Sequence, residues 1–212
     1  MDLVIRGADI YNGRGGAPYK GDVAVSDGKI AAVGTVDARG AEEIDANGLA
    51  LMPGIIDSHT HFDAQITWDP WCTPSPALGV TSVLIGNCGF TIAPCKAPDR
   101  DLIMKNLVQV EGMSLDVLRS GIAWDFETFP EYLDMLEARG SALNVGAFLG
   151  HSSLRTYVMG DAATERAAND DEIAEMARLV RAAMEAGAVG FATSTAPQHN
   201  GWGGVPMPSR LA

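Results

Sequence analysis

Two histidines separated by one residue are the first feature of this sequence that could do chemistry. His59 and His61 lie in the segment 57–63, Asp-Ser-His-Thr-His-Phe-Asp, directly after the apolar segment 49–56. Side chains along a strand alternate between its two faces, so these two project to the same side of a strand end. Two converging imidazoles can bind one divalent metal ion. The alternative is a pair of polar loop side chains, but the preceding apolar segment favours the metal site.

Cys88 is the second candidate, in the segment 85–90, Ile-Gly-Asn-Cys-Gly-Phe, which closes another apolar run. Neighbouring parallel strands end at one edge of a sheet, so we expect Cys88 to lie near His59 and His61. A thiolate is a good zinc ligand, and metal binding keeps it deprotonated. The alternative is a small buried side chain, but the flanking Gly86 and Gly89 favour a tight loop with an accessible backbone. The other two cysteines, Cys72 and Cys95, are expected to be ordinary buried residues.

The elements that must position these residues differ along the chain. Residues 1–50 are rich in short apolar runs and turns, among them Asp27-Gly28 between two apolar segments, which is typical of a hairpin. We therefore predict a small antiparallel sheet there. Apolar runs without polar alternation follow at 49–56, 80–86, 143–150 and 188–192, as expected of strands covered on both faces of a parallel sheet. Helical patterns at 128–139 and 170–186 complete an α/β arrangement with right-handed crossovers.

Composition excludes several classes of function. The 212 residues, 47% of them hydrophobic, suit a packed globular chain. A formal net charge of −12 would repel nucleic acid. No signal peptide is visible, and no apolar run approaches the roughly 20 residues of a membrane helix. An odd number of cysteines argues against a disulfide framework and favours reduced thiols in the cytoplasm.

Together these residues resemble the amidohydrolase superfamily and, within it, the D-aminoacylase (N-acyl-D-amino-acid deacylase) family. The His-x-His pair marks the superfamily, and Gly-Asn-Cys-Gly with it indicates this branch. The resemblance runs through nearly the whole chain, including the segments 53–65, 68–70, 79–83, 86–90, 124–129 and 150–155.

The resemblance implies a (β/α)₈ barrel of the amidohydrolase type with its active site at the carboxyl ends of the strands. Residues 51–212 would form only the first four β/α units, and residues 1–50 part of a small β-sandwich built from both chain termini. In this family the cysteine bridges metal ions as a carboxylated lysine does in hydantoinase-like relatives. No lysine follows Lys105, so such a bridge from the fourth strand is not available. Further histidine ligands and the catalytic aspartate would lie beyond Ala212.

The function implied is that of a zinc-dependent hydrolase, with one or two zinc ions, acting on non-peptide C–N amide bonds. The expected substrate is a small N-acyl-D-amino acid, cleaved to a carboxylate and a D-amino acid. We expect the 212-residue chain to be an incomplete fragment that binds zinc weakly and hydrolyses nothing. The alternatives are a non-catalytic metal-binding or interaction module, whose unpaired strand edges would favour association, and a hydantoinase-like cyclic amidase. The sequence does not predict the oligomeric state.

Four further residues are candidates for contacts with substrate. His151 follows the third apolar run, and His199 lies in a glycine-rich, tryptophan-bearing segment after the fourth. Arg155 and Arg210 could each clamp a carboxylate in bidentate fashion. The alternatives are a loop hydrogen bond for His151, a plain surface loop for the segment of His199, and surface salt bridges for the two arginines.

Overall fold

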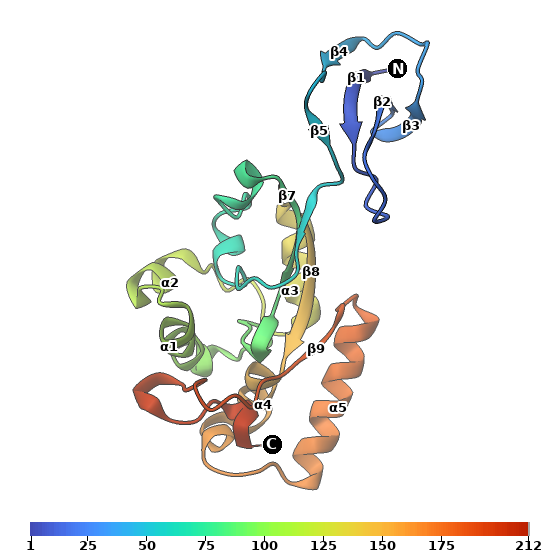
Figure 1. The fold of residues 1–212 in the computed structure, drawn as a ribbon. Helices are drawn as coiled ribbons and strands as arrows, with labels where there is room; N and C mark the ends of the chain where they lie inside the picture. The colour runs from blue at the N-terminus through green and yellow to red at the C-terminus, as the bar shows by residue number, and fades with distance from the viewer. Residues whose placement is uncertain (212) are drawn as a thin grey trace. The chain divides into compact units, whose positions relative to one another are not determined.

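The chain divides into two compact units, Met1–Gly54 and Ile55–Ala212. The computed structural model describes residues 1–211 (Figure 1). Each unit has its own sheet, and each is described by itself.

The first unit is one five-stranded sheet. Its strands are β1 (Leu3–Ile10), β2 (Tyr19–Ser26), β3 (Lys29–Gly34), β4 (Glu42–Asp45) and β5 (Ala50–Leu51). They are arranged in the order β3-β2-β1-β4, and β5 also pairs with β1.

The prediction of an antiparallel sheet is right for only part of this unit. β1, β2 and β3 pair antiparallel, and Asp27 and Gly28 both have positive φ in the turn between β2 and β3. That conformation is typical of the tight turns that match strand twist. β4 and β5, however, pair with β1 in parallel. The segment after β3 passes to the opposite edge of β1 before β4 begins, so the sheet is mixed.

The second unit contains a parallel sheet of four strands, as predicted. β6 (Ile55–Asp57), β7 (Val80–Ile85), β8 (Asn144–Gly150) and β9 (Gly190–Ala192) lie side by side in chain order. The apolar segment 49–56 proves to be two strands, β5 in the first unit and β6 in the second. Pro53 and Gly54 separate them.

Burial on both faces, expected for all four strands, is incomplete: in β7 the buried Val83 and Ile85 lie on one face, and Leu84 between them is only half-buried. Val83 and Ile85 of β7 are fully buried, whereas Ile56 of β6 and Phe191 of β9 are 67% and 42% exposed. The reason is topological: within the described residues β6 and β9 are the edge strands, and each has a strand neighbour on one side only.

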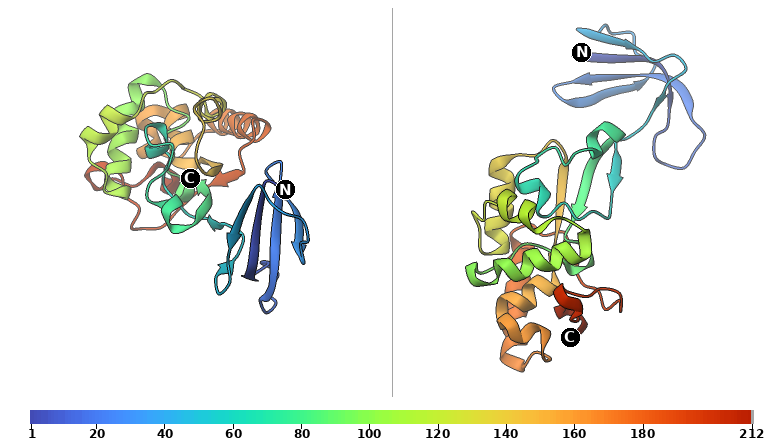
Figure 2. Two further views of the ribbon diagram at one scale, coloured as in Figure 1. Left: turned by 90° about the horizontal axis from the view of Figure 1, so that it is seen from above. Right: turned by 90° about the vertical axis from the view of Figure 1, so that its left-hand side faces the viewer.

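Within residues 1–211, five α-helices accompany this sheet (Figure 2). The two predicted helices are present as α3 (Phe129–Arg139) and α5 (Asp170–Glu185), and both begin with a capping box, Thr128 with Glu131 and Asn169 with Glu172. The sequence did not predict α1 (Arg100–Glu111), α2 (Leu115–Gly121) and α4 (His151–Met159). None of the described helices is long and apolar enough to cross a membrane.

One buried cluster joins the helices to β7 and β8. Ile103, Met104 and Leu107 bring α1 into this cluster, and Phe129 and Tyr132 bring α3. The Tyr132 hydroxyl, itself buried, donates a hydrogen bond of 2.9 Å to the backbone oxygen of Asp63. The core therefore holds the segment that follows β6, where the two histidines lie.

Candidate metal centre

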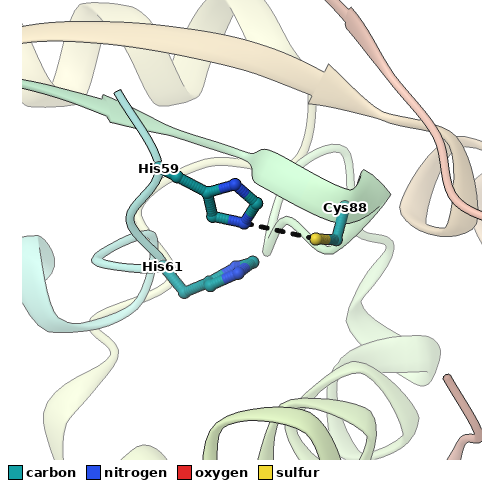
Figure 3. Close-up of side chains that lie close together, drawn as sticks. All are labelled: His59, His61 and Cys88. Carbon is teal, nitrogen blue, oxygen red and sulfur yellow. Dashed lines mark hydrogen bonds between the residues drawn. The ribbon is translucent and has the colours of Figure 1, made fainter. Parts of the chain in front are cut away.

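The carboxyl ends of β6 and β7 bring His59, His61 and Cys88 together (Figure 3). One possible ligand atom from each residue lies within 4.8 Å of the other two. Cys88 Sγ is 3.4 Å from His59 Nε2, and the two imidazole centroids are 5.3 Å apart. The juxtaposition follows from parallel pairing, because residues after neighbouring strands emerge at the same edge of the sheet.

Thr60 explains why the two histidines face the same way. Its backbone N–H and its hydroxyl both donate to the carbonyl oxygen of Leu84, at 3.1 and 2.8 Å, and the residue is buried. With Thr60 turned toward β7, its two neighbours project to the opposite side. The Asn87 side-chain amide then donates to the carbonyls of Thr60 and Leu84, at 3.2 and 2.9 Å. The histidine and cysteine segments are thus hydrogen-bonded to each other.

The loop that carries Cys88 is tight. Gly86, Cys88 and Gly89 have φ values of 83°, 56° and 80°, and a Cβ at Gly86 would collide with the carbonyl oxygen of Phe148. A positive φ is uncommon for a residue other than glycine, and backbone strain of this kind tends to cluster at functional sites. The Gly86 N–H also donates to the buried Asp63 carboxyl at 3.0 Å. The loop conformation is therefore held from both sides.

Burial dominates the electrostatics of this centre. It lowers the pKa of His61 to about 4, helped by His59 and His199, so the imidazole is neutral near pH 7. Burial raises the pKa of Asp63 to about 7. It also raises the pKa of the Cys88 thiol, and the negative charge of Glu111 adds to that effect. A neutral imidazole is the form that binds metals. A bound cation would lower the pKa of the Cys88 thiol and so favour the thiolate.

Sequence reasoning missed Glu111, the last residue of α1. Its Oε1 atom lies 3.4 Å from His61 Nδ1, and the two side chains are only 16% and 17% exposed. Burial raises the pKa of this carboxyl to about 7. Nothing in the sequence marks Glu111, because only tertiary packing brings the end of α1 to the segment after β6.

The donor set fits a zinc ion. Two imidazoles and one thiolate are typical zinc ligands, and three protein ligands are the number found in open, catalytic sites. The buried Nδ1 of His61 and the buried Oε1 of Glu111 each lack a hydrogen-bond partner within residues 1–211. A cation bound by this histidine would favour their pairing.

The four residues predicted to contact substrate lie after β8 and β9. His151 is the first residue of α4, and its Nδ1 is 2.8 Å from the Thr193 hydroxyl. Arg155 is buried rather than at the surface, with 1% exposure, and donates to the carbonyl of Arg166 at 2.9 Å. Both line an apolar groove between α4 and α5, whose lining includes no residue of the metal centre.

Phe90 links His199 to the metal centre. The His199 ring contacts Phe90 with centroids 5.0 Å apart, and Phe90 lies 6.4 Å from the His61 ring. Nδ1 of His199 is 2.8 Å from the Ser194 hydroxyl. The Arg210 guanidinium donates to the backbone oxygen of His199 at 3.3 Å and also to the Asn200 side chain, so it holds this loop. Cys72 and Cys95 are buried, as expected.

Comparison with known proteins identifies the family. The model of the amidohydrolase family matches residues 42–200, which is most of the chain. The chain therefore belongs to the amidohydrolase family.

Individual relatives agree with the resemblance to the D-aminoacylase branch. An N-acyl-D-aspartate deacylase of Alcaligenes xylosoxydans xylosoxydans is 41% identical over 195 residues, which cover 92% of this chain and 36% of that protein. A solved D-aminoacylase with a binuclear metal center is 34% identical, with a TM-score of 0.77, over 93% of this chain and 40% of its own.

A third relative was solved with a metal and an inhibitor. The structure of an N-acyl-D-glutamate deacylase from Bordetella bronchiseptica, complexed with zinc and a phosphonate inhibitor, is 33% identical with a TM-score of 0.75. The match covers 91% of this chain and 38% of that one. The chain thus spans about two-fifths or less of the length of these relatives.

Proposed function

We propose that this chain contributes to the active site of a zinc-dependent deacylase that cleaves N-acyl-D-amino acids to a carboxylate and a D-amino acid. His59, His61 and Cys88 are the proposed ligands of one or two zinc ions. The observation that carries the proposal is the convergence of these three side chains at one sheet edge. The similarity to deacylases of N-acyl-D-amino acids supports the choice of substrate.

Zinc bound in this centre would polarise the amide carbonyl of the substrate and lower the pKa of a water molecule. The residues of the chain have simpler tasks. His61, whose pKa is about 4, offers a lone pair throughout the neutral range. Cys88 loses its proton to solvent when it binds the metal, so binding tightens as the pH rises.

The rest of the active site is proposed from the resemblance. The four parallel strands would form the first half of a (β/α)₈ barrel within residues 51–212, and residues 1–50 part of a β-sandwich. The proton-shuttling carboxylate would come from residues beyond Ala212. Of the four candidates for substrate contact, His199 has the strongest support, because it adjoins Phe90 beside the metal centre. His151, Arg155 and Arg210 would shape the pocket from further away.

A non-catalytic metal-binding or interaction module is the second candidate. The exposed apolar side chains of the edge strands, Ile56 and Phe191, favour it, because an unpaired strand edge associates readily. A hydantoinase-like cyclic amidase has less support, because the fourth strand, β9, contains no lysine.

The test is an assay of the gene's complete product against matched N-acyl-D- and N-acyl-L-amino acids and cyclic ureides. We expect turnover of the D series alone, abolished in Cys88→Ala. Turnover of cyclic ureides alone would exclude the deacylase. The 212-residue chain assayed by itself should show no hydrolysis, and activity there would mean that four strands suffice.

A further inference from the structure

Glu111 occupies an electrostatically unfavourable position. It is the last residue of α1, and Gly112 ends the helix in the left-handed conformation. The carboxyl end of a helix carries partial negative charge, which opposes an acidic side chain there. The carboxyl is also mostly buried, and the Asp63 carboxyl nearby is close enough to feel its charge. Helix formation and packing alone would favour a neutral or basic residue at this position.

The position of Glu111 is nevertheless well defined. Ile103, Met104 and Leu107 of α1 lie in the main core, and the Asn106 side chain accepts a hydrogen bond from the backbone N–H of Trp202 at 3.2 Å. The helix therefore directs its last residue toward the segment after β6. There Oε1 of Glu111 is 3.4 Å from Nδ1 of His61, and neither buried atom has a hydrogen-bond partner among the described residues.

The chemistry of the two groups makes the contact directional. An ionised carboxylate only accepts hydrogen bonds, so a pairing with Glu111 in that form requires the proton of the neutral imidazole to be on Nδ1. The lone pair is then on Nε2, the nitrogen that remains available to a metal. Histidine ligands commonly donate their other N–H to a carboxylate, which orients the ring and makes it a stronger ligand.

The other nearby carboxyl is already engaged. Asp63 accepts from the Gly86 N–H at 3.0 Å and so holds the loop that carries Cys88. His59 has its Nε2 toward Cys88, and its imidazole has no carboxylate partner in the described chain, although its backbone N–H donates to the Asp57 carboxylate at 3.3 Å. Glu111 and His61 thus form a pair distinct from the contacts that support the other two proposed ligands.

We propose that Glu111 is a positioning residue that accepts a hydrogen bond from Nδ1–H of His61 and thereby presents Nε2 to the metal. The inference rests on the proposed metal centre. Glu111 itself binds neither the metal nor the substrate.

The experiment measures zinc affinity by competition with a chromophoric chelator at one pH. It compares the unaltered chain with Glu111→Leu, Glu111→Gln and the control Gln109→Leu, an exposed site two residues earlier on α1. We expect Glu111→Leu to lose about 10–100-fold in affinity. Glu111→Gln, whose amide oxygen can still accept from Nδ1, should lose less, and Gln109→Leu should match the unaltered chain. Equal affinity in all four proteins would overturn the inference.

A second readout separates positioning from a merely structural role and does not require metal. The chain has four histidines, so ¹⁵N resonances of the imidazoles can be assigned with single His→Asn variants. We expect His61 in the Nδ1–H form in the metal-free chain and a shift toward Nε2–H in Glu111→Leu. The Nε2–H form in the unaltered chain would overturn the inference even if Glu111→Leu fails to fold. An Nδ1–H form that depends on Glu111, in a chain without zinc affinity, would confirm the hydrogen bond between the two side chains but refute the metal centre and, with it, the role of Glu111 toward a metal.

Discussion

The loops after β6 and β7 bring possible metal ligands together, whereas those after β8 and β9 do not, although all four leave the same sheet in the same direction. In the first pair, His59, His61 and Cys88 converge within 4.8 Å. In the second pair, His151 and His199 each direct Nδ1 to a hydroxyl, on Thr193 and Ser194.

The difference is local in origin. His59 and His61 alternate with Thr60, which is anchored to β7, and glycines on both sides of Cys88 permit a tight loop. His151, in contrast, begins α4, so the helix determines its direction. The end of a strand therefore places a residue at this edge of the sheet, but the local backbone conformation decides whether its side chain reaches the metal centre.

The largest expected effect comes from removing the thiol. Cys88→Ala should weaken zinc binding by more than the roughly 10–100-fold expected for loss of a ligand's hydrogen-bond partner, since a ligand itself is lost. His151→Asn, a change at the other pair of loops, should leave the affinity within about twofold. Isothermal titration with zinc measures both. Equal losses in the two variants would refute the distinction between the two pairs of loops.

The glycines at the two ends of β7 offer a closer comparison. Gly79 and Gly86 have nearly identical backbones, with φ of 86° and 83° and ψ of 8° and 13°. A Cβ at Gly79 meets only the Ile55 side chain at 3.7 Å, whereas one at Gly86 collides with Phe148. Gly79→Ala should therefore cost about 1–2 kcal/mol in the free energy of unfolding, the usual penalty of a left-handed conformation.

Gly86→Ala should cost more than Gly79→Ala and should also weaken zinc binding, because the loop must shift. Urea denaturation and zinc titration of both variants provide the measurements. If the two variants are equally stable, the collision at Gly86 is relieved without disturbing the loop.

The smallest expected effect concerns pH and the first turn of α5. The Arg166 guanidinium, together with the Asn169 N–H, lowers the pKa of Glu172 from 4.5 to about 2. A carboxyl with a lowered pKa in the folded state stabilises the fold above its unfolded pKa. That contribution is lost as the pH falls from about 4.5 to about 2, and the solvent exposure of the Arg166 side chain keeps it small.

Glu172→Gln should therefore flatten the pH dependence of stability between about pH 5 and pH 2, with the remaining carboxyls still titrating. Thermal unfolding at several pH values would reveal the change. Asp171→Asn is the matched control, an acidic residue of the same helical turn. An equal flattening in the control would show that Glu172 has no special contribution.

Several features of the fold could be predicted because they depend on neighbouring residues. The parallel strands β7 and β8 followed from unbroken apolar runs, and α3 and α5 from helical periodicity and caps. α1 was missed even though Ile103, Met104 and Leu107 recur at helical spacing. The parallel pairing of β4 and β5 with β1 could not be predicted, since nothing local determines which edge of a strand a later segment will join.

The sequence by itself determined the donor types and their alternation: two imidazoles on one side of a strand end, and a thiol between glycines. Those properties depend on residue type and on the period of a strand, which are local. Only the tertiary structure decided that Glu111 meets His61, that Arg155 is buried, and that His199 rather than His151 lies beside Phe90. Each of these contacts joins segments distant in sequence, and the packing of helices on the sheet, not any pattern within a segment, determines them.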